Sequence, residues 1–432
     1  MIASEFSPHL GSSPSLAGTS WLEAISTQYI LSILENAGFE ARIVGGAVRN
    51  ALLGQPVKDI DIATTAIPEE VSIIAERAGL GVISVGSLYG TVIVRSYDKD
   101  FEITTLREDI VTNGRHAEVR FIKAWETDAQ RRDFTVNAIY CDKRGNIFDP
   151  LNGLKDLASS TIRFIGCPDR RISEDYLRIL RFFRFFAQYG NGSPDRSSLK
   201  ACVRGREGLH KLSRDRIRQE FLKLLAAPNA VASIDSMQSH GLLCILLPVV
   251  PRVTHLARLI SRAPNSSYAL RLATLCLTVA EDVEQVSKAL KLSKMDKKDL
   301  ENIAEVLCFH STPPTPYLVR QSIYNHGREK VKQRLHYLRS VSLKSDTNTD
   351  WNQLEELANT WAVPKFPITG HDILLLAELT GPKLGEIIRE TKANWIRSDF
   401  ALSSDSLLAY AKDLVRKAKK NNQLLGKTEN SS

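Results

Sequence analysis

Two kinds of hydrophobic pattern divide this chain of 432 residues into a mixed part and a helical part. Strand-type apolar runs are concentrated before residue 149, with helical stretches such as 68–78 between them. These runs cover residues 41–44, 60–63, 81–85, 91–94, 101–105 and 136–140. Beyond residue 149 the apolar residues recur with helical spacing. The pattern predicts an α+β head with a mixed β-sheet, followed by an elongated all-α arm.

Turn-rich segments indicate how the chain is subdivided. They lie at 190–198, 311–316 and 345–350. The last residues show no periodicity and are expected to fray. We expect six regions: a flexible leader (1–20), the head (21–150), a helical neck (151–226), a helical body (227–345), a helical tail (346–420) and a disordered end (421–432).

The composition is that of a folded protein. Hydrophobic residues make up 43% and charged residues 25%, which excludes a disordered or collagen-like chain. The longest apolar run, 241–250, is too short for a membrane span, and the first residues lack the pattern of a targeting peptide. The six cysteines show no paired spacing, so we expect no disulfides, no zinc and a reducing, cytoplasmic setting. The net charge of +8 favours a polyanionic partner.

A pair of glycines lies where the first strand-type run meets a helix. Gly45 and Gly46 allow a ligand to approach the backbone, and the helix that follows offers free N–H groups to an anion. Arg49, in the first turn, can hold a phosphate with its guanidinium. For this segment taken alone, a tight turn with a solvated arginine is the alternative.

Two aspartates alternate with isoleucines on the next strand-type run. Asp59 and Asp61 therefore point to one face, where their carboxylates repel each other unless a cation lies between them. Mg²⁺ prefers oxygen ligands, and two such ions about 3.5–4 Å apart are the known arrangement for in-line phosphoryl transfer. Asp100 and Glu102 are candidates for a third carboxylate, of which Glu102 is favoured. A charged strand edge facing solvent is the alternative.

The segments GGAVRNALLG and DIDIATT together resemble the signature of the polymerase-β-like nucleotidyltransferase superfamily. More narrowly, they resemble its class II branch, the tRNA nucleotidyltransferases (CCA-adding enzymes) and bacterial poly(A) polymerases. The resemblance implies that Asp59 and Asp61 hold Mg²⁺, and that the two glycines and Arg49 contact the nucleotide. The first block has the pattern GGxVRD in the family, whereas this chain has Asn50 in place of the aspartate. Asparagine keeps the size and one acceptor but loses the charge.

A second block, RRDFTVNA at 131–138, also matches the family. An adjacent arginine and aspartate can hold a phosphate and a ribose hydroxyl together, and the resemblance implies that Arg132 and Asp133 contact the nucleotide. An Arg–Asp ion pair at the start of a strand is the alternative. The preceding segment, 107–130, is expected to be a long loop. The resemblance implies that this loop is a flexible element in nucleotide choice.

The segment SEDYLRILRFFRFF predicts a helix over 173–189 with Ser173 as its N-cap. A stripe on this helix carries a charge at every third position: Asp175, Arg178, Arg181 and Arg184. The resemblance identifies the stripe with the family's EDxxR motif, in which side chains replace a nucleic-acid template. Asp175 as acceptor and Arg178 as donor would select ATP and CTP over GTP and UTP, while Arg181 and Arg184 would contact base or triphosphate. An ordinary amphipathic helix with an Asp–Arg pair is the alternative.

The later segments carry weaker signals. Residues 212–225 resemble the next family block, ERxxxExxK, which we interpret as structural support with an Arg216–Glu220 pair. Basic residues crowd 320–339 and recur at 412–420. These basic faces either follow an RNA backbone or simply face solvent.

The residues and the resemblance together predict an Mg²⁺-dependent nucleotidyltransferase that adds CCA to the 3′ end of tRNA from CTP and ATP. Poly(A) tailing is the alternative, although 85–94 lacks the basic segment that bacterial poly(A) polymerases of this branch carry. No residue excludes a split enzyme that adds only CC or only A. Remoter alternatives are a catalytically silent RNA-binding protein and a two-metal phosphohydrolase, the latter without an HD-type His/Asp cluster. The oligomeric state is left open.

Overall fold

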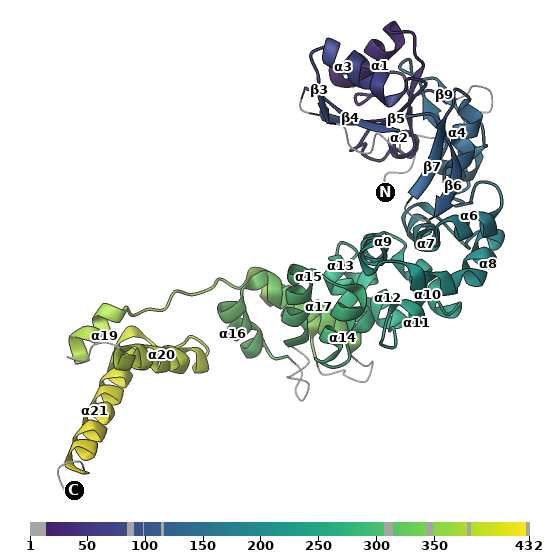
Figure 1. The fold of residues 1–432 in the computed structure, drawn as a ribbon. Helices are drawn as coiled ribbons and strands as arrows, with labels where there is room; N and C mark the ends of the chain where they lie inside the picture. The colour runs from purple at the N-terminus through teal and green to yellow at the C-terminus, as the bar shows by residue number, and fades with distance from the viewer. Residues whose placement is uncertain are drawn as a thin grey trace. The chain divides into compact units, whose positions relative to one another are not determined.

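The computed structural model describes residues 14–83, 90–97, 99–113, 116–305, 314–342, 349–377 and 382–428 (Figure 1). The chain forms two compact units. The first comprises Met1–Ile260 and Glu284–Lys294, and the second comprises Ser261–Val283 and Met295–Ser432. The predicted head and neck therefore both lie within the first unit. The finer boundaries between neck, body and tail stay predictions.

A seven-stranded sheet forms the centre of the head. Its strands lie in the order β3-β4-β5-β2-β1-β8-β9. Their bounds are β1 Ala41–Val44, β2 Asp61–Thr64, β3 Gly81–Ile83, β4 Thr91–Ser96, β5 Lys99–Thr105, β8 Tyr140–Cys141 and β9 Ile147–Phe148. Strands β2 and β5 run parallel and the other paired neighbours run antiparallel. The predicted α+β head with a mixed sheet is confirmed.

Helices α1 (Ile25–Asn36) and α3 (Pro68–Arg77) lie side by side against this sheet (Figure 1). The apolar stripe of α1 is buried, with Ile30 and Leu34 almost inaccessible to solvent. Proline at the first position of α3 is suited to a helix start, because that position needs no N–H donor. The short helix α2 (Gly46–Leu52) follows β1 directly.

The predicted long loop 107–130 is wrong, because this segment forms a hairpin and a helix. Their bounds are β6 Arg107–Asn113, β7 His116–Phe121 and α4 Trp125–Arg131. The mixed charge that suggested a loop belongs to an exposed hairpin, on which Arg120 pairs with Glu108 across the strands at 2.5 Å.

The strand expected at 136–140 is also different in the structure. Residues Thr135–Asn137 form a 3₁₀ turn, and strand β8 begins only at Tyr140. The side chains of Phe134, Val136 and Ile139 are all fully buried. A fully buried apolar run has no alternation from which strand and turn could be told apart.

The neck consists of helices packed next to the head. Their bounds are α5 Gly153–Ala158, α6 Pro168–Glu174, α7 Leu177–Tyr189, α8 Arg196–Arg204, a 3₁₀ segment Arg206–Lys211 and α9 Arg214–Ala226. The continuous helix predicted over 173–189 is wrong, because the chain is extended at Asp175 (φ −154°, ψ 108°). The Oδ1 atom of Asp175 accepts a hydrogen bond from the backbone N–H of Leu177 at 3.0 Å, so Asp175 ends α6 and supports the start of α7.

An aromatic cluster joins the neck to the head. The ring of Phe134, in the second sequence block, lies 4.9 Å from that of Phe164 and 5.0 Å from that of Phe185 on α7. Phe164 also stacks on Phe182 with ring centres 5.7 Å apart. Such contacts between aromatic rings contribute beyond their buried area. They hold α7 against the segment that carries Arg132 and Asp133.

The remaining elements are helices, as predicted for the arm. Their bounds are α10 Ala230–Ser239, α11 Leu243–Leu246, α12 Val253–Arg262, α13 Tyr268–Cys276, α14 Asp282–Leu290, α15 Lys294–Ala304, α16 Pro316–His326, α17 Arg328–Val341, α18 Trp351–Thr360, α19 Gly370–Ala377, α20 Pro382–Arg397 and α21 Ser404–Thr428. Within the described ranges, no helix has both the length and the apolar character to cross a membrane. The cysteines within the described ranges carry free thiols.

The two ends of the chain are more ordered than predicted where they are described. Within the expected leader 1–20, Leu16 is buried and its backbone N–H donates to the carbonyl of Gly145 at 2.9 Å. Residues 1–13 lie outside the described part. At the other end, α21 runs through 421–428 of the expected disordered end, since its Lys, Gln and Leu residues favour helix.

Candidate active site

The three predicted carboxylates lie together where the start of β2 faces the middle of β5. Asp61 pairs in register with Glu102 across the parallel strands β2 and β5. Asp59 and Asp61 are exposed while Ile60 and Ile62 are buried, so both aspartates face the same side. Asp100, the other candidate, instead forms an ion pair with Arg95 at 2.6 Å. The structure therefore brings Glu102, and not an unpaired Asp100, to the aspartates.

This arrangement disfavours simultaneous ionisation of all three carboxyl groups. Protein atoms around the Asp61 carboxyl raise its pKa to about 6, with further contributions from Glu102 and Asp59 and an opposing one from Arg132. None of the three carboxylates forms an ion pair with a described residue. A cation between them would relieve the repulsion.

The carboxylates fit a metal that keeps part of its shell for substrate. Across the residues that the structure describes, no three His, Cys, Asp or Glu side chains form a ready-made metal cage. Mg²⁺ is commonly held by one or two carboxylates together with substrate phosphates, and not by a cage of protein ligands. The oxygen donors of Asp59 and Asp61 match this preference.

The glycine pair lies where β1, the strand next to β2, meets helix α2. Gly45 has φ +73° and ψ −118°, a backbone conformation that only glycine adopts readily. Its N–H donates to the carbonyl of Ile139 at 3.2 Å, which ties the turn to the second block. Gly46 begins α2. Nucleotide contact by the two glycines stays a prediction.

Arg49 lies inside the protein and not on its surface. Its side chain is buried and donates to the Oδ1 of Asn137, to the Oδ1 of Asn50 at 2.9 Å and to the hydroxyl of Tyr189 at 2.7 Å. Burial lowers its pKa, an effect that the Tyr189 hydroxyl partly opposes. The guanidinium thus links α2 to the end of α7, and its predicted contact with a phosphate stays a prediction.

Arg132 is held by a buried carboxylate. Asp128 on α4 is inaccessible to solvent and accepts from Arg132 at 3.0 Å, from Arg131 at 2.7 Å and from the Tyr140 hydroxyl at 2.8 Å. Burial alone would raise the pKa of Asp128, but the two arginines lower it below its usual range. Sequence reasoning missed Asp128, because one acid in a charged segment has no distinctive spacing.

Asp133 connects the head to helix α7. Its Oδ2 accepts hydrogen bonds from Arg181, at 2.8 Å from Nε, and its Oδ1 accepts from the amide of Asn137 at 3.0 Å. Burial would raise the pKa of Asp133, but Arg181 and Asn137 lower it to about 2. The structure therefore brings together two predicted nucleotide-binding residues from distant parts of the sequence.

The other charges of the stripe pair with neighbours and not with each other. The Oδ2 of Asp175 accepts from Arg216 at 2.6 Å, while Nη1 of Arg178 donates to Glu174 and to the carbonyl of Arg171 at 2.7 Å. Asp175 and Arg178 are therefore near neighbours with separate partners. Their predicted roles with the nucleobase stay predictions.

The predicted Arg216–Glu220 pair is wrong. Arg216 bonds to Asp175, and Glu220 accepts from Arg184 at 2.6 Å. Both pairs join α9 to the segment around α7, so this helix supports the stripe as expected, but through inter-helix contacts. Helical spacing alone cannot distinguish a pair within a helix from pairs between helices.

Arg171 is a further residue that sequence reasoning missed. It is buried on α6, donates to the backbone carbonyls of Arg131 and Arg132, and pairs with Glu174 at 2.8 Å. It thereby fixes the backbone that precedes Asp133. The Arg-Arg pair directly before the SED segment was the only signal for it.

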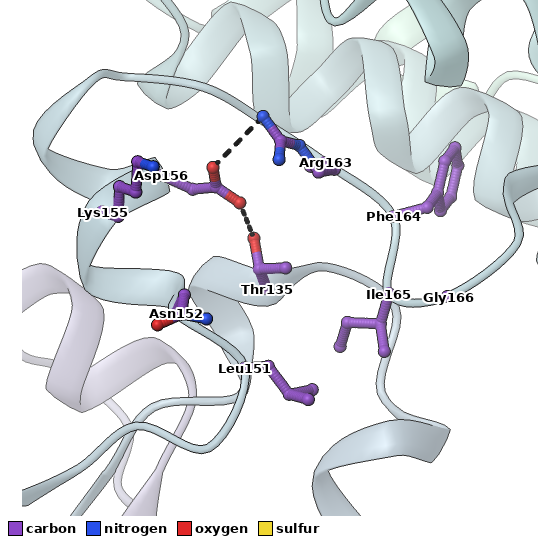
Figure 2. A pocket seen from close by; sticks show the side chains of 9 residues that line it. All are labelled: Thr135, Leu151, Asn152, Lys155, Asp156, Arg163, Phe164, Ile165 and Gly166. Carbon is purple, nitrogen blue, oxygen red and sulfur yellow. Dashed lines mark hydrogen bonds and ion pairs between the residues drawn. The ribbon is translucent and has the colours of Figure 1, made fainter.

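A separate hollow of roughly 450 Å³ lies between the second block and α5. Figure 2 shows Asp156 at its wall, accepting from the hydroxyl of Thr135 at 2.7 Å and facing Arg163 at 3.5 Å. Lys155 lines the same hollow. None of the predicted site residues lines it, so we assign the candidate active site to the carboxylates and the neighbouring arginines.

Comparisons with known proteins agree with this geometry. Residues 41–163 match the family described as the poly(A) polymerase head domain. Residues 193–252 match the family described as the probable RNA and SrmB-binding site of polymerase A. The mitochondrial CCA tRNA nucleotidyltransferase 1 of Danio rerio is 34% identical over 88% of this chain and 89% of that protein. The human protein of the same name is 32% identical over 90% of both.

Bacterial proteins and a solved structure extend the likeness. The CCA-adding enzyme of Streptococcus gordonii is 30% identical over 89% of this chain and 96% of that protein. The crystal structure of the Bacillus stearothermophilus CCA-adding enzyme in complex with CTP superimposes with a TM-score of 0.69 and 26% identity, covering 92% of this chain and 98% of that one. Since the similarity runs over most of both chains, this protein belongs to the CCA-adding tRNA nucleotidyltransferase family.

Proposed function

We propose that this enzyme adds C, C and A in turn to the 3′ end of tRNA, using CTP, ATP and Mg²⁺ and no nucleic-acid template. The observation that carries this proposal is the Asp133–Arg181 pair, which joins the head bearing the carboxylates to the helix bearing the stripe. The names of the relatives, and the CTP bound in the Bacillus stearothermophilus structure, support these substrates.

In this proposal the catalytic carboxylates are Asp59, Asp61 and Glu102, of which the two aspartates hold the metal. When bound there, Mg²⁺ lowers the pKa of the terminal RNA hydroxyl and neutralises the leaving pyrophosphate. Glu102, in register with Asp61, adds negative potential where the cation binds. Arg132 lies near enough to Asp61 to lower its pKa, which supports a role for Arg132 in binding the triphosphate next to the metal.

Selection of the base is proposed to depend on Asp175 and Arg178. The Asp175 carboxylate accepts from the exocyclic amine of cytosine or adenine, and Arg178 donates to the adjacent ring nitrogen. Nη1 of Arg178 donates to Glu174, which orients the side chain, and in this proposal its remaining N–H groups donate to the base. In uracil and guanine a carbonyl oxygen would face the Asp175 carboxylate, so that neither acceptor would have a donor.

We also propose a cytoplasmic location, on the basis of scattered cysteines typical of a reducing compartment. Some relatives are named as mitochondrial, so the alternative is an organelle. Fluorescence microscopy of the full chain, tagged at its C-terminus, distinguishes the two.

The function is tested by sequencing RNA 3′ ends after incubation with Mg²⁺ and all four nucleoside triphosphates. The substrates are a tRNA transcript without CCA and an unrelated RNA of equal length. We expect CCA on the tRNA followed by a stop. Long A tails on both RNAs would instead indicate a poly(A) polymerase, and CC alone or A alone would indicate a split enzyme. No extension would indicate a silent RNA-binding protein.

A further inference from the structure

The surroundings of Arg49 show an unusual way of holding a buried cation. Across the described residues no carboxylate forms an ion pair with Arg49, although its side chain is only 6% exposed. Its donors go instead to three neutral oxygens, those of Asn50, Asn137 and Tyr189. Buried charges are normally paired with an opposite charge. This cation therefore depends on each neutral acceptor more than an ion-paired arginine would.

Asn50 occupies the position at which the first family block has an aspartate. Its Oδ1 accepts from both Nη2 and Nε of Arg49, at 2.9 and 3.3 Å. A carboxylate in the same place would bind the guanidinium with charge-assisted hydrogen bonds, which are about twice as strong as neutral ones. The substitution thus leaves Arg49 with a weaker partner on its own helix.

Tyr189 supplies a second partner from a different part of the fold. Its hydroxyl accepts from Nη2 of Arg49 at 2.7 Å and donates to Oδ1 of Asn50 at 3.3 Å. The guanidinium also lies over the Tyr189 ring, 4.2 Å from its centre, which adds a cation–π contact. Since Tyr189 is the last residue of α7, this contact joins the end of α7 to α2.

The same guanidinium reaches the predicted sugar-binding aspartate. Arg49 donates to the Oδ1 of Asn137, whose amide donates to Asp133, and Asp133 accepts from Arg181 of α7. Arg49 is therefore fixed to α7 at two points, directly through Tyr189 and indirectly through Asp133. A change in either point alters how α7 faces the head.

We infer that Tyr189 is a positioning residue that compensates for the missing charge at position 50 and holds α7 in register with the head for nucleotide binding. The inference rests on the proposed nucleotidyl transfer. It makes positions 50 and 189 interdependent: a carboxylate at one should replace the hydroxyl at the other.

The test is a double-mutant cycle of Tyr189→Phe and Asn50→Asp in the full chain, with kcat and KM measured for CTP on tRNA lacking CCA. We expect Y189F to raise KM for CTP by about tenfold to a hundredfold, as for a lost hydrogen bond to a charged group, with kcat within about twofold. N50D alone should change KM little, and N50D/Y189F should restore it to within about twofold of the wild type.

A matched control removes a tyrosine hydroxyl elsewhere. Tyr268 donates to Asp296 at 2.7 Å within the second unit, so Y268F loses a hydrogen bond to a charged group outside the unit that holds this site. Y268F should leave KM for CTP unchanged, and N50D should not alter its behaviour. An additive cycle, in which N50D fails to rescue Y189F, would overturn the inference, as would an unchanged KM in Y189F.

Failure of the proposed function is distinguishable from failure of this inference. If the wild type incorporates no nucleotide, the function is at fault, and the cycle is then measured by urea unfolding. Coupling between positions 50 and 189 in the free energy of unfolding supports the contact, and its absence contradicts it.

Discussion

The carboxylate edge (Asp59, Asp61 and Glu102) and the arginine junction (Arg132, Arg178, Arg181 and Arg184) are organised in opposite ways. Each arginine of the junction already has a carboxylate partner inside the protein. The acids of the edge have none among the described residues, and the pKa of Asp61 rises to about 6. The charges of one region are already paired within the protein, whereas in the proposed mechanism a cation neutralises those of the other.

This difference has a physical reason. An arginine held by a carboxylate keeps N–H donors beyond those used by that partner, and these donors can still bind a triphosphate. Ion pairs therefore orient the junction without abolishing its function. Metal binding needs carboxylates without a competing cation, so neutralising partners on the edge would oppose it.

The largest effect is expected from removing the edge itself. The double variant Asp59→Asn/Asp61→Asn should lose about 1,000-fold or more in the rate of incorporation, because a metal supplies several kcal/mol of transition-state stabilisation. The control is Asp100→Asn on β5, whose carboxylate pairs with Arg95 and should be dispensable within about twofold. Incorporation by the double variant at the wild-type rate would remove the metal assignment.

The next largest effect is expected on nucleotide preference, when the proposed base acceptor Asp175, next to the arginine junction, is removed. Asp175→Ala should reduce the preference for CTP over UTP by about 100-fold, since the acceptor for the exocyclic amine is lost. Arg216→Ala removes only the side chain that holds Asp175 and should have a smaller effect on preference. Equal effects of the two variants would mean that Asp175 acts through structure alone. Competition between CTP and UTP on one tRNA gives the ratio directly.

The two regions should also differ in how the free energy of unfolding depends on pH. With its pKa lowered to about 2, ionised Asp133 stabilises the fold fully above its unfolded pKa near 4, and this stability is lost as pH falls through 2. Asp133→Asn should cost about 2 kcal/mol at pH 7, or about 4–8 °C in Tm. Urea unfolding at pH 7, 4 and 3 should show the difference from wild type shrinking. A constant difference would contradict the assigned cause.

At the carboxylate edge, ionisation should change the free energy of unfolding in the opposite direction and by a smaller amount. The pKa of Asp61 is raised to about 6, so its ionisation destabilises the fold; this loss of stability begins as pH rises above the unfolded pKa near 4 and is complete once pH has passed through 6. Asp61→Asn should raise Tm by about 1–3 °C at pH 7.5 without Mg²⁺, a modest gain because the residue is exposed. The gain should vanish below pH 4. Added Mg²⁺ should stabilise the wild type but not this variant.

Local sequence patterns were sufficient wherever the structure follows a short-range rule. Alternation with buried isoleucines predicted that Asp59 and Asp61 share a face. Glu102 was favoured over Asp100 from its apolar flanks alone; it pairs in register with Asp61, whereas Asp100 pairs with Arg95, and its role as the third carboxylate stays a prediction. The helices of the arm were predicted because their apolar periodicity is strong.

The failures occurred where a side chain's partner comes from a distant element. Asp175 was expected within a helix, but its bonds to Leu177 and Arg216 place it at a helix break. The expected loop at 107–130 is a hairpin and a helix, and the helix carries Asp128, which holds Arg132. Neither relation has a fixed spacing in sequence.

By itself, the sequence determined the mixed head and the helical arm, and it singled out the charged residues for which we propose metal and nucleotide binding. Periodicity and short motifs contain that information because they depend on neighbours a few residues apart. Only the tertiary structure decided how those charges are paired. Arg49 meets Tyr189, and Asp133 meets Arg181, because aromatic packing brings α7 to the head. Which charges are satisfied inside the protein depends on such long-range contacts, which leave no local pattern.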